Sequence, residues 1–531
     1  MMTFIALLPL LSLFLFMVIL EKPAYISAPI SLSVTAAASL LYWRMEIDWF
    51  GASLIRGGFI ALEIVIILIG VLLMVSVLKK ANAFLIIDQF VSKLSKDARV
   101  QAIFLAWFLV AFMEGVAGFG TPAMVAAPLM VILGFSPLSA ITMTLIADAV
   151  PVTFGAAGVP ITIGIAEGVS VSQAAMLGPG FVMATAVSAA LFHLIIGTFI
   201  PFIILCVLGL IQDKSLRKAF AAWKFALASG LAFTVPSALT AFLLGPEFPS
   251  IIGSLIGAAI MILLVRRGIT VPKETWVLAK KSEDEYGQKV SYRRLMPAIA
   301  PYVFVVAMLF LTRLNIFGAG EFFRGVSFGM SNSMGTTVSY ILYPLYSAGF
   351  FFFIAALVSF VWYRLSFHDA LDVLKITGKK VGIAAVSLVA VLGIVQIMIF
   401  SDHNLMEYPS FTGHVLSKLT AAGALWPLAA PFVGLFGTFI AGSSTVSNLL
   451  FASVQVDTAV ALGMAPVLGL VLQSIGSAAG NMIAVHNIIA VSTVVHVHHV
   501  EGKVFKYNIL PALGYSLAAG VIGLLIMYVA L

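Results

Sequence analysis

The feature that most constrains this chain is a succession of apolar runs, each about as long as a helix that crosses a lipid bilayer. The first three lie near residues 3–20, 25–43 and 58–78, and about 20 apolar residues in a helix cover the ~30 Å of membrane hydrocarbon. Of the 531 residues, 62% are hydrophobic and only 10% are charged, whereas roughly a quarter of the residues of a soluble domain are charged. The sequence therefore predicts an all-α polytopic membrane protein with about 12–14 transmembrane helices.

The basic residues indicate how these helices are oriented in the membrane. Basic residues gather in five connections between apolar runs: 79–99, 214–224, 266–294, 364–380 and 503–506. Three other connections carry few of them: 244–250, 314–347 and 401–412. Because short cytoplasmic loops are rich in Lys and Arg, the first set is predicted to lie inside the cell and the second outside. The net charge of +7 thus comes from loops, and the predicted partner is a lipid bilayer and not nucleic acid.

Further features of the chain bear on its organisation. Residues 1–20 lack a basic start and a small-residue cleavage site, so we expect a first transmembrane helix and not a signal peptide. The single cysteine, Cys206, allows no intrachain disulfide. A polar stretch at 273–294 is too short for a domain, so we expect a cytoplasmic linker between two membrane halves, 1–272 and 295–531.

Each predicted half contains apolar segments interrupted by Gly, Pro, Ser and Thr. The first half has Phe119-Gly120-Thr121-Pro122 and a second break at 151–160. The second half has Phe436-Gly437-Thr438, then the polar run 443–448, and then a break within 476–487. Paired interrupted segments are typical of transporters built from two repeats with broken or re-entrant helices, whose solute site lies where the repeats meet.

Ionisable side chains within these interrupted segments are candidate functional groups. Glu114 and Asp148 flank the first breaks, and His486 lies in the last one. Charged groups at membrane depth are costly and usually functional, and burial disfavours a charged carboxylate, so each of the three could carry a proton. The alternatives are a structural hydrogen bond for Glu114, a bridge between helices for Asp148 and a pore-lining role for His486.

The motifs around these breaks resemble those of the L-lactate permeases. The resemblance begins at Glu114-Gly115 and Gly118-Phe119-Gly120, continues through Phe154-Gly155-Ala156, and returns at Gly442-Ser443 and Ser447-Asn448. It covers nearly the whole chain and implies uptake of lactate or a similar 2-hydroxymonocarboxylate across the cytoplasmic membrane with a proton. The chain departs from the family pattern at three positions. Asp148 stands where an amide is usual, Ser444 where an acidic residue is usual, and Asn481 where a lysine is usual.

A carboxylate that enters the membrane must replace its lost hydration. Backbone N–H groups at the N-termini of half-helices can do so, and Gly allows their close approach. The substrate-binding candidates are therefore polar or glycine-rich positions at the breaks, namely Gly118, Phe119, Gly120, Thr121, Ser443, Ser444, Thr445, Ser447, Asn448 and Asn481. The alternative is that these small residues only let helices pack closely.

Other function classes lack the residues that they require. The sequence has no His-Glu-x-x-His, no pair of cysteines and no phosphate-binding loop, so neither an enzyme nor a cofactor is predicted. The tract His496-Val497-His498-His499 lacks a second ligand set and is not predicted to be a metal site. A channel would have a continuous polar pore. Sodium remains an alternative coupling ion, exchange of another organic anion an alternative activity, and the oligomeric state is not predicted.

Overall fold

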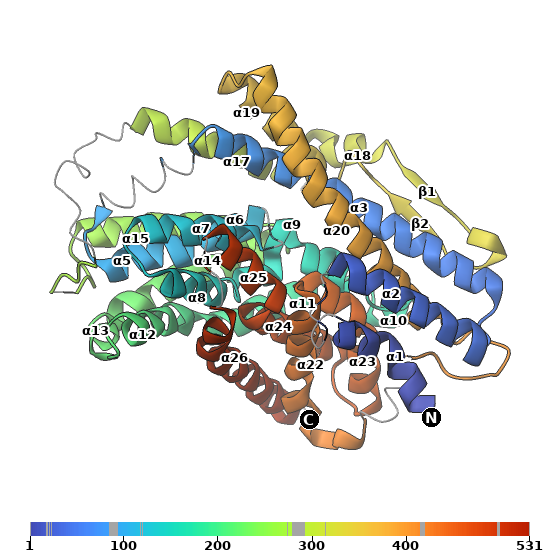
Figure 1. Ribbon diagram of the computed structural model, residues 1–531. Helices are drawn as coiled ribbons and strands as arrows, with labels where there is room; N and C mark the ends of the chain where they lie inside the picture. Colours follow the sequence, from blue (N-terminus) through green and yellow to red (C-terminus); the bar gives the residue numbers. More distant parts are fainter. Residues whose placement is uncertain are drawn as a thin grey trace.

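The computed structural model shows an almost entirely helical chain (Figure 1). It describes residues 2–16, 20, 22, 24–83, 86, 94–116, 118, 120–272, 274–278, 292–313, 315–411, 413–414, 420–495, 497 and 500–529. Most of the predicted linker thus lies outside the described residues. Within them, the only strands are β1 (Phe328–Met330) and β2 (Tyr340–Leu342), which form a short antiparallel pair. The all-α polytopic fold class is confirmed.

Ten helices in the described ranges are long and apolar enough to cross a membrane, or eleven if one bent pair counts as a span. The bent pair joins Pro137–Ala147 to Pro151–Ile165 at an angle of 55°. Four further apolar helices are shorter: Met2–Leu13, Thr121–Ile132, Ala300–Leu309 and Ala348–Trp362. The dozen or more helices predicted from the apolar runs therefore include full crossings and shorter pieces that end at breaks.

The helices pack as two groups, and each half of the sequence contributes to both. The first helix group lies along the top and right of Figure 1 and consists of α2 (Ala24–Ala37), α3 (Ile47–Lys80), α17 (Tyr292–Arg313), α19 (Ala348–Trp362) and α20 (Phe367–Phe400). Helix α3 packs along both α19 and α20. A Cβ on Gly70 would lie only 2.0 Å from the Gly349 carbonyl oxygen, so glycines set this close approach.

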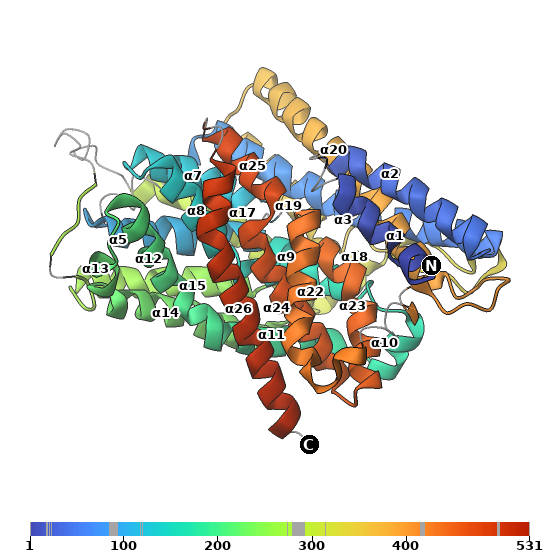
Figure 2. The ribbon, with the colours of Figure 1, turned by 60° about the horizontal axis from the view of Figure 1, so that its bottom comes forward.

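The second helix group holds the interrupted segments of both halves. Its elements from the first half are α5 (Ala98–Ala102), η3 (Ile103–Leu109), α6 (Val110–Val116), α7 (Thr121–Ile132), α8 (Pro137–Ala147), η4 (Pro151–Phe154), α9 (Gly155–Val159), η5 (Pro160–Ile165), α10 (Val171–Leu177), α11 (Phe181–Ile196), η6 (Gly197–Phe199), α12 (Ile200–Gln212), α13 (Arg217–Phe220), α14 (Trp223–Leu244) and α15 (Pro249–Arg266). Those from the second half are α22 (Trp426–Ala441), α23 (Ser444–Ala461), α24 (Pro466–Gly480), η10 (Asn481–Ile483), α25 (Val485–Val494) and α26 (Glu501–Val529). Figure 2 shows α22, α24 and α26 side by side, in agreement with their mutual contacts. The shorter elements α1 (Met2–Phe14) and α18 (Ala319–Arg324) lie at the edges of the two groups.

The two halves of the second group follow the same order of helix, break, helix, helix, break. The first break follows α6 at Gly118 (φ +55°) and its counterpart follows α22 at Gly442 (φ +68°), both in the left-handed conformation that favours glycine. The second helix after the break is α8 in the first half, which ends at Asp148, and α24 in the second half, which ends at Asn481. The expected break at Phe436-Gly437-Thr438 is wrong, because Gly437 lies inside α22 and this helix ends at Gly442.

The basic connections 79–99 and 364–380 lie at the opposite end of α3 and α20 from the connection 401–412. At one end, Lys80 Nζ lies 3.1 Å from Asp369 Oδ1 and 3.0 Å from Asp372 Oδ2. At the other end, Met45 pairs with Asn404 and Trp43 Nε1 donates to the Pro409 carbonyl over 2.9 Å. The basic connections and the connections poor in Lys and Arg are thus separated here, as the positive-inside rule predicts.

A buried polar contact joins the two helix groups. Arg56 of α3 donates to Gln396 Oε1 of α20 over 2.5 Å and to Glu167 Oε2, just beyond η5, over 2.7 Å. The side chains of Arg56 and Glu167 are only 10% and 24% exposed. The ion pair therefore ties the second group to the first.

We expect Arg56→Gln to destabilise the protein, because it leaves Glu167 buried without its cation. Breaking a fully buried pair costs about 3–5 kcal/mol, and the loss here should lie below that range because Glu167 keeps some exposure. The effect is measured as the change in melting temperature in detergent, with unfolding detected by the reactivity of Cys206. The double variant Arg56→Gln/Glu167→Gln should recover part of the lost stability; a double variant that melts below both single variants would contradict the ion pair.

Candidate functional site

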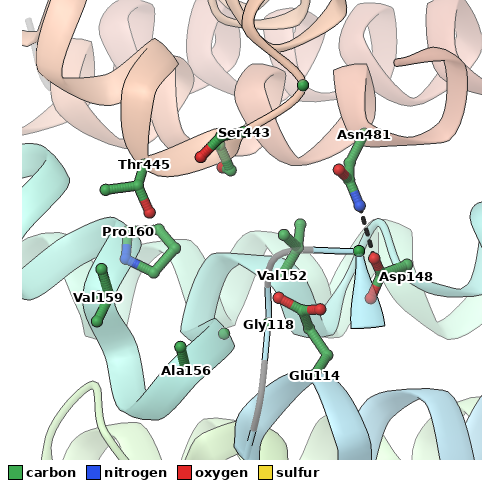
Figure 3. Close-up of a pocket in the computed structure, with 14 residues that line it drawn as sticks. Glu114, Gly118, Asp148, Val152, Ala156, Val159, Pro160, Ser443, Thr445 and Asn481 are labelled. Atoms are coloured by element: carbon green, nitrogen blue, oxygen red, sulfur yellow. Dashed lines mark hydrogen bonds between the residues drawn. The ribbon is translucent and has the colours of Figure 1, made fainter. Parts of the chain in front are cut away.

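A small cavity lies where the breaks of the two halves meet (Figure 3). Its volume is about 20 Å³, which is about the room for one water molecule. The first half supplies Glu114, Gly118, Gly120, Asp148, Val152, Gly155, Ala156, Val159 and Pro160 to its lining, and the second half supplies Gly442, Ser443, Ser444, Thr445 and Asn481. We call this the central cavity. Residues more than 300 positions apart in sequence, such as Glu114 and Ser443, therefore line the same small cavity.

Glu114 projects into the central cavity from the last turn of the helix that precedes the first break. Its side chain is buried, with 2% exposure, and its Oε2 atom has no hydrogen-bond partner among the described residues. Gly155 makes room for the carboxyl group: a Cβ built on Gly155 would lie 2.1 Å from Glu114 Oε1, closer than any side chain tolerates. The position of Glu114 thus depends on a glycine in the second break of the same half.

Asp148 ends α8 and faces both Glu114 and the second half. Its Oδ2 atom accepts a hydrogen bond from Asn481 Nδ2 over 2.6 Å, and Asn481 Oδ1 accepts one from Asn487 Nδ2 over 2.7 Å. Its Oδ1 atom has no hydrogen-bond partner within the described part of the chain, and the Asp148 and Glu114 carboxyl groups both line the central cavity. The described lining contains no Lys, Arg or His. Two carboxyl groups therefore meet without a cation.

The opposite wall of the central cavity is the start of α23. Ser443 precedes this 18-residue helix as its N-cap, and its hydroxyl accepts a hydrogen bond from the Val446 N–H over 3.4 Å. Ser444 bonds to Ser477 of α24 over 2.6 Å, while Thr445 completes this part of the lining. The start of α7, after Gly120 (φ +74°), contributes a second helix N-terminus nearby. Unpaired N–H groups and the positive end of the helix dipole favour anions at such places.

Several predicted site residues lie elsewhere than in this lining. Ser447 donates to the Gly434 carbonyl over 2.8 Å, and Asn448 donates to the Pro160 carbonyl over 2.9 Å, so both join helices together. Thr121 is buried in the first turn of α7 and does not line the cavity. Phe119 and the side chain of His486 lie outside the described residues, as does most of the histidine tract at 496–499.

The sequence prediction overlooked the wall formed by Val152, Gly155, Ala156, Val159 and Pro160. Its signal was present, because the Gly- and Pro-rich stretch at 151–160 follows Asp148 directly. By contrast, the three positions that are predicted from the sequence to depart from the family pattern, Asp148, Ser444 and Asn481, all line the central cavity. Positions that are scattered in the sequence therefore lie at one site.

Paired broken helices around a buried polar cavity, within a bundle of membrane-spanning helices, are typical of membrane transporters. The sequence pattern of the family described as L-lactate permease matches residues 2–530. The chain belongs to the L-lactate permease family, and it is accordingly a multi-pass transporter of the cell membrane and not an enzyme.

Individual relatives align with this chain over nearly their full length. A putative L-lactate permease of Haemophilus influenzae is 28% identical over 519 residues, covering 94% of this chain and 93% of the relative. An L-lactate permease of Bacillus subtilis is 28% identical over 546 residues, covering 95% of this chain and 92% of the relative. A glycolate permease of Escherichia coli is 24% identical over 571 residues, covering 99% of this chain and 95% of the relative.

Proposed function

We propose that this protein takes up L-lactate, or a related small 2-hydroxymonocarboxylate such as glycolate, together with a proton. The observation that carries the coupling is the pair of carboxyl groups of Glu114 and Asp148, which meet in the central cavity without a cation in the described lining. Two adjacent negative charges in a medium of low dielectric constant repel strongly, so such pairs hold a proton between them. An oxygen on each group without another partner suits this shared proton.

Binding of a substrate anion links to this proton through charge. A carboxylate that enters the central cavity brings another negative charge close to Glu114 and Asp148. Uptake of a further proton by the pair offsets that charge, so anion and proton each favour the binding of the other. The anion itself would be held by the helix starts at Gly120 and Ser443, with the hydroxyl of Thr445 available to the 2-hydroxyl group. Gly118, Ser444 and Asn481 complete the proposed binding residues.

The small volume of the central cavity implies that the protein must move for transport. About 20 Å³ is too little for a three-carbon acid, so the central cavity must widen to admit one. We propose that the second helix group moves against the first, which exposes the cavity to one side of the membrane and then to the other. The contact between Arg56 and Glu167 crosses the surface along which this movement would occur.

The choice of substrate rests on the names of the relatives, which are L-lactate permeases and a glycolate permease. Uptake of labelled L-lactate into proteoliposomes tests the proposal, first with a proton gradient and then with a sodium gradient. We expect accumulation with the proton gradient and its collapse with an uncoupler. Accumulation with sodium but not with protons would favour the alternative of a sodium-coupled transporter. Failure with both gradients would point to another organic anion, because Ser444 and Asn481 alter the site.

A further inference from the structure

We propose that a second cavity, beside Arg324, is an entry site that binds the carboxylate before it reaches the central cavity. This inference rests on the proposed function, and it adds a binding site that lies outside the broken helices. The cavity has a volume of about 390 Å³, which is ample for a small organic acid. It lies between the helix groups, with Arg324, Tyr343 and Tyr346 on one side and the segment 156–163 on the other. We call it the Arg324 cavity.

Arg324 is the cation that a carboxylate would meet in this cavity. Its guanidinium lies 4.3 Å above the centre of the Tyr346 ring, and its Nη2 donates to the Tyr346 hydroxyl over 3.1 Å. No carboxylate of the described residues forms an ion pair with it. A guanidinium has five N–H donors and binds a carboxylate with two parallel hydrogen bonds. The stacked ring thus holds the group in place while most of its donors remain available.

The rest of this wall suits the remainder of a 2-hydroxy acid. Ser347 is the N-cap of α19, a helix of 15 residues, and its hydroxyl accepts from the Gly349 N–H over 3.3 Å. The hydroxyl proton of Ser347 and the phenol of Tyr343 can both reach into the cavity. A carboxylate on Arg324 therefore has hydroxyl groups and a helix N-terminus beside it, and these can bind its 2-hydroxyl group.

Two acidic residues also line the Arg324 cavity, and they bear on how tightly it binds. Glu63 accepts a hydrogen bond from Tyr340, and Glu247 makes other contacts within the chain. Their negative charges oppose tight binding of an anion. We therefore expect a weak, transient site, which is what an entry site requires, because a tightly held anion would not move on.

The Arg324 cavity adjoins the central cavity through a thin wall. Ala156 and Val159 line both spaces. The backbone of this wall takes three consecutive left-handed conformations, at Ala156 (φ +45°), Ala157 (φ +57°) and Gly158 (φ +81°). A left-handed conformation costs an alanine roughly 1–2 kcal/mol. Arg324 belongs to the connection 314–347, which the basic-residue pattern places outside the cell, so the order of sites is Arg324 first and the central cavity second.

A cysteine-protection experiment tests this inference. In a Cys206→Ser background, which has no other cysteine, Thr162→Cys places a thiol in the wall of the Arg324 cavity without removing a proposed binding group. We expect a membrane-impermeant maleimide to label it from outside, and saturating L-lactate to slow the labelling at least threefold. Adding Arg324→Gln should remove the protection. Protection that persists in Arg324→Gln, or that is absent from the start, would overturn the proposal.

Two controls separate protection by lactate bound in the Arg324 cavity from effects elsewhere in the protein. In the same background, the variant Phe317→Cys, at a side chain that is 99% exposed, should be labelled at the same rate with and without lactate. Uptake of lactate by the same vesicles tests the proposed function separately, so that a transporter with normal uptake and no protection would count against the Arg324 site only.

In uptake assays Arg324→Gln should raise KM about tenfold with little change in kcat, as loss of a weak entry site requires, and Arg324→Lys should raise KM less. A fall in kcat with unchanged KM would contradict an entry site.

Discussion

Glu114→Gln is expected to abolish accumulation of substrate driven by a proton gradient, while exchange of labelled for unlabelled substrate continues. A difference of one pH unit is worth about 1.4 kcal/mol per proton, so two units can drive roughly 100-fold accumulation if one proton accompanies each anion. Glutamine keeps the size of Glu114 but cannot carry a proton. The accumulation ratio should therefore fall to about one, measured in proteoliposomes with an imposed gradient.

The comparison variants decide which carboxyl group carries the proton. Glu46→Gln removes a carboxyl group that is exposed and makes no capping hydrogen bond, so accumulation should be unchanged. Asp148→Asn should weaken accumulation less than Glu114→Gln, because Asp148 is already bonded to Asn481. Normal accumulation by Glu114→Gln together with a loss in Asp148→Asn would reverse these roles, and normal accumulation by both would direct attention to His486.

Gly155→Ala is expected to remove most of the transport activity, because the added methyl group collides with the Glu114 carboxyl group. The Cβ would lie 2.1 Å from Glu114 Oε1 and 3.1 Å from its Cδ. The backbone of Gly155, at φ −66° and ψ 154°, is one that alanine adopts readily, so the substitution tests the collision and not backbone strain. We expect the initial rate of uptake to fall at least tenfold, which corresponds to about 1.4 kcal/mol.

Gly58→Ala is the matched control for this substitution. Gly58 lies within α3, and a Cβ there would meet no atom within 4 Å, so uptake should be normal. Both variants should reach the membrane in similar amounts, which a melting curve in detergent and an expression blot would check. Full activity of Gly155→Ala would mean that Glu114 does not occupy this position during transport.

Much of the site could be predicted from residue types. Glu114 and Asp148 were identified because charges are costly at membrane depth, and both line the central cavity. Gly118 and Ser443 were identified because glycines and capping residues accompany helix breaks, and both stand at such breaks. Ser447 and Asn448 share the chemistry of Ser443, but α23 turns them toward Gly434 and Pro160. Residue type cannot show which side of a helix faces a cavity.

The sequence by itself determined that this protein is a bundle of membrane helices with two sets of breaks, because the hydrophobic effect acts on the length and spacing of apolar runs. Only the tertiary structure decided that Asp148 meets Asn481 from the other half, and that Gly155 makes room for Glu114. It also decided that the helices sort into two groups across both halves of the chain. Such contacts depend on how helices distant in sequence pack side by side, and no local pattern of residues specifies that packing.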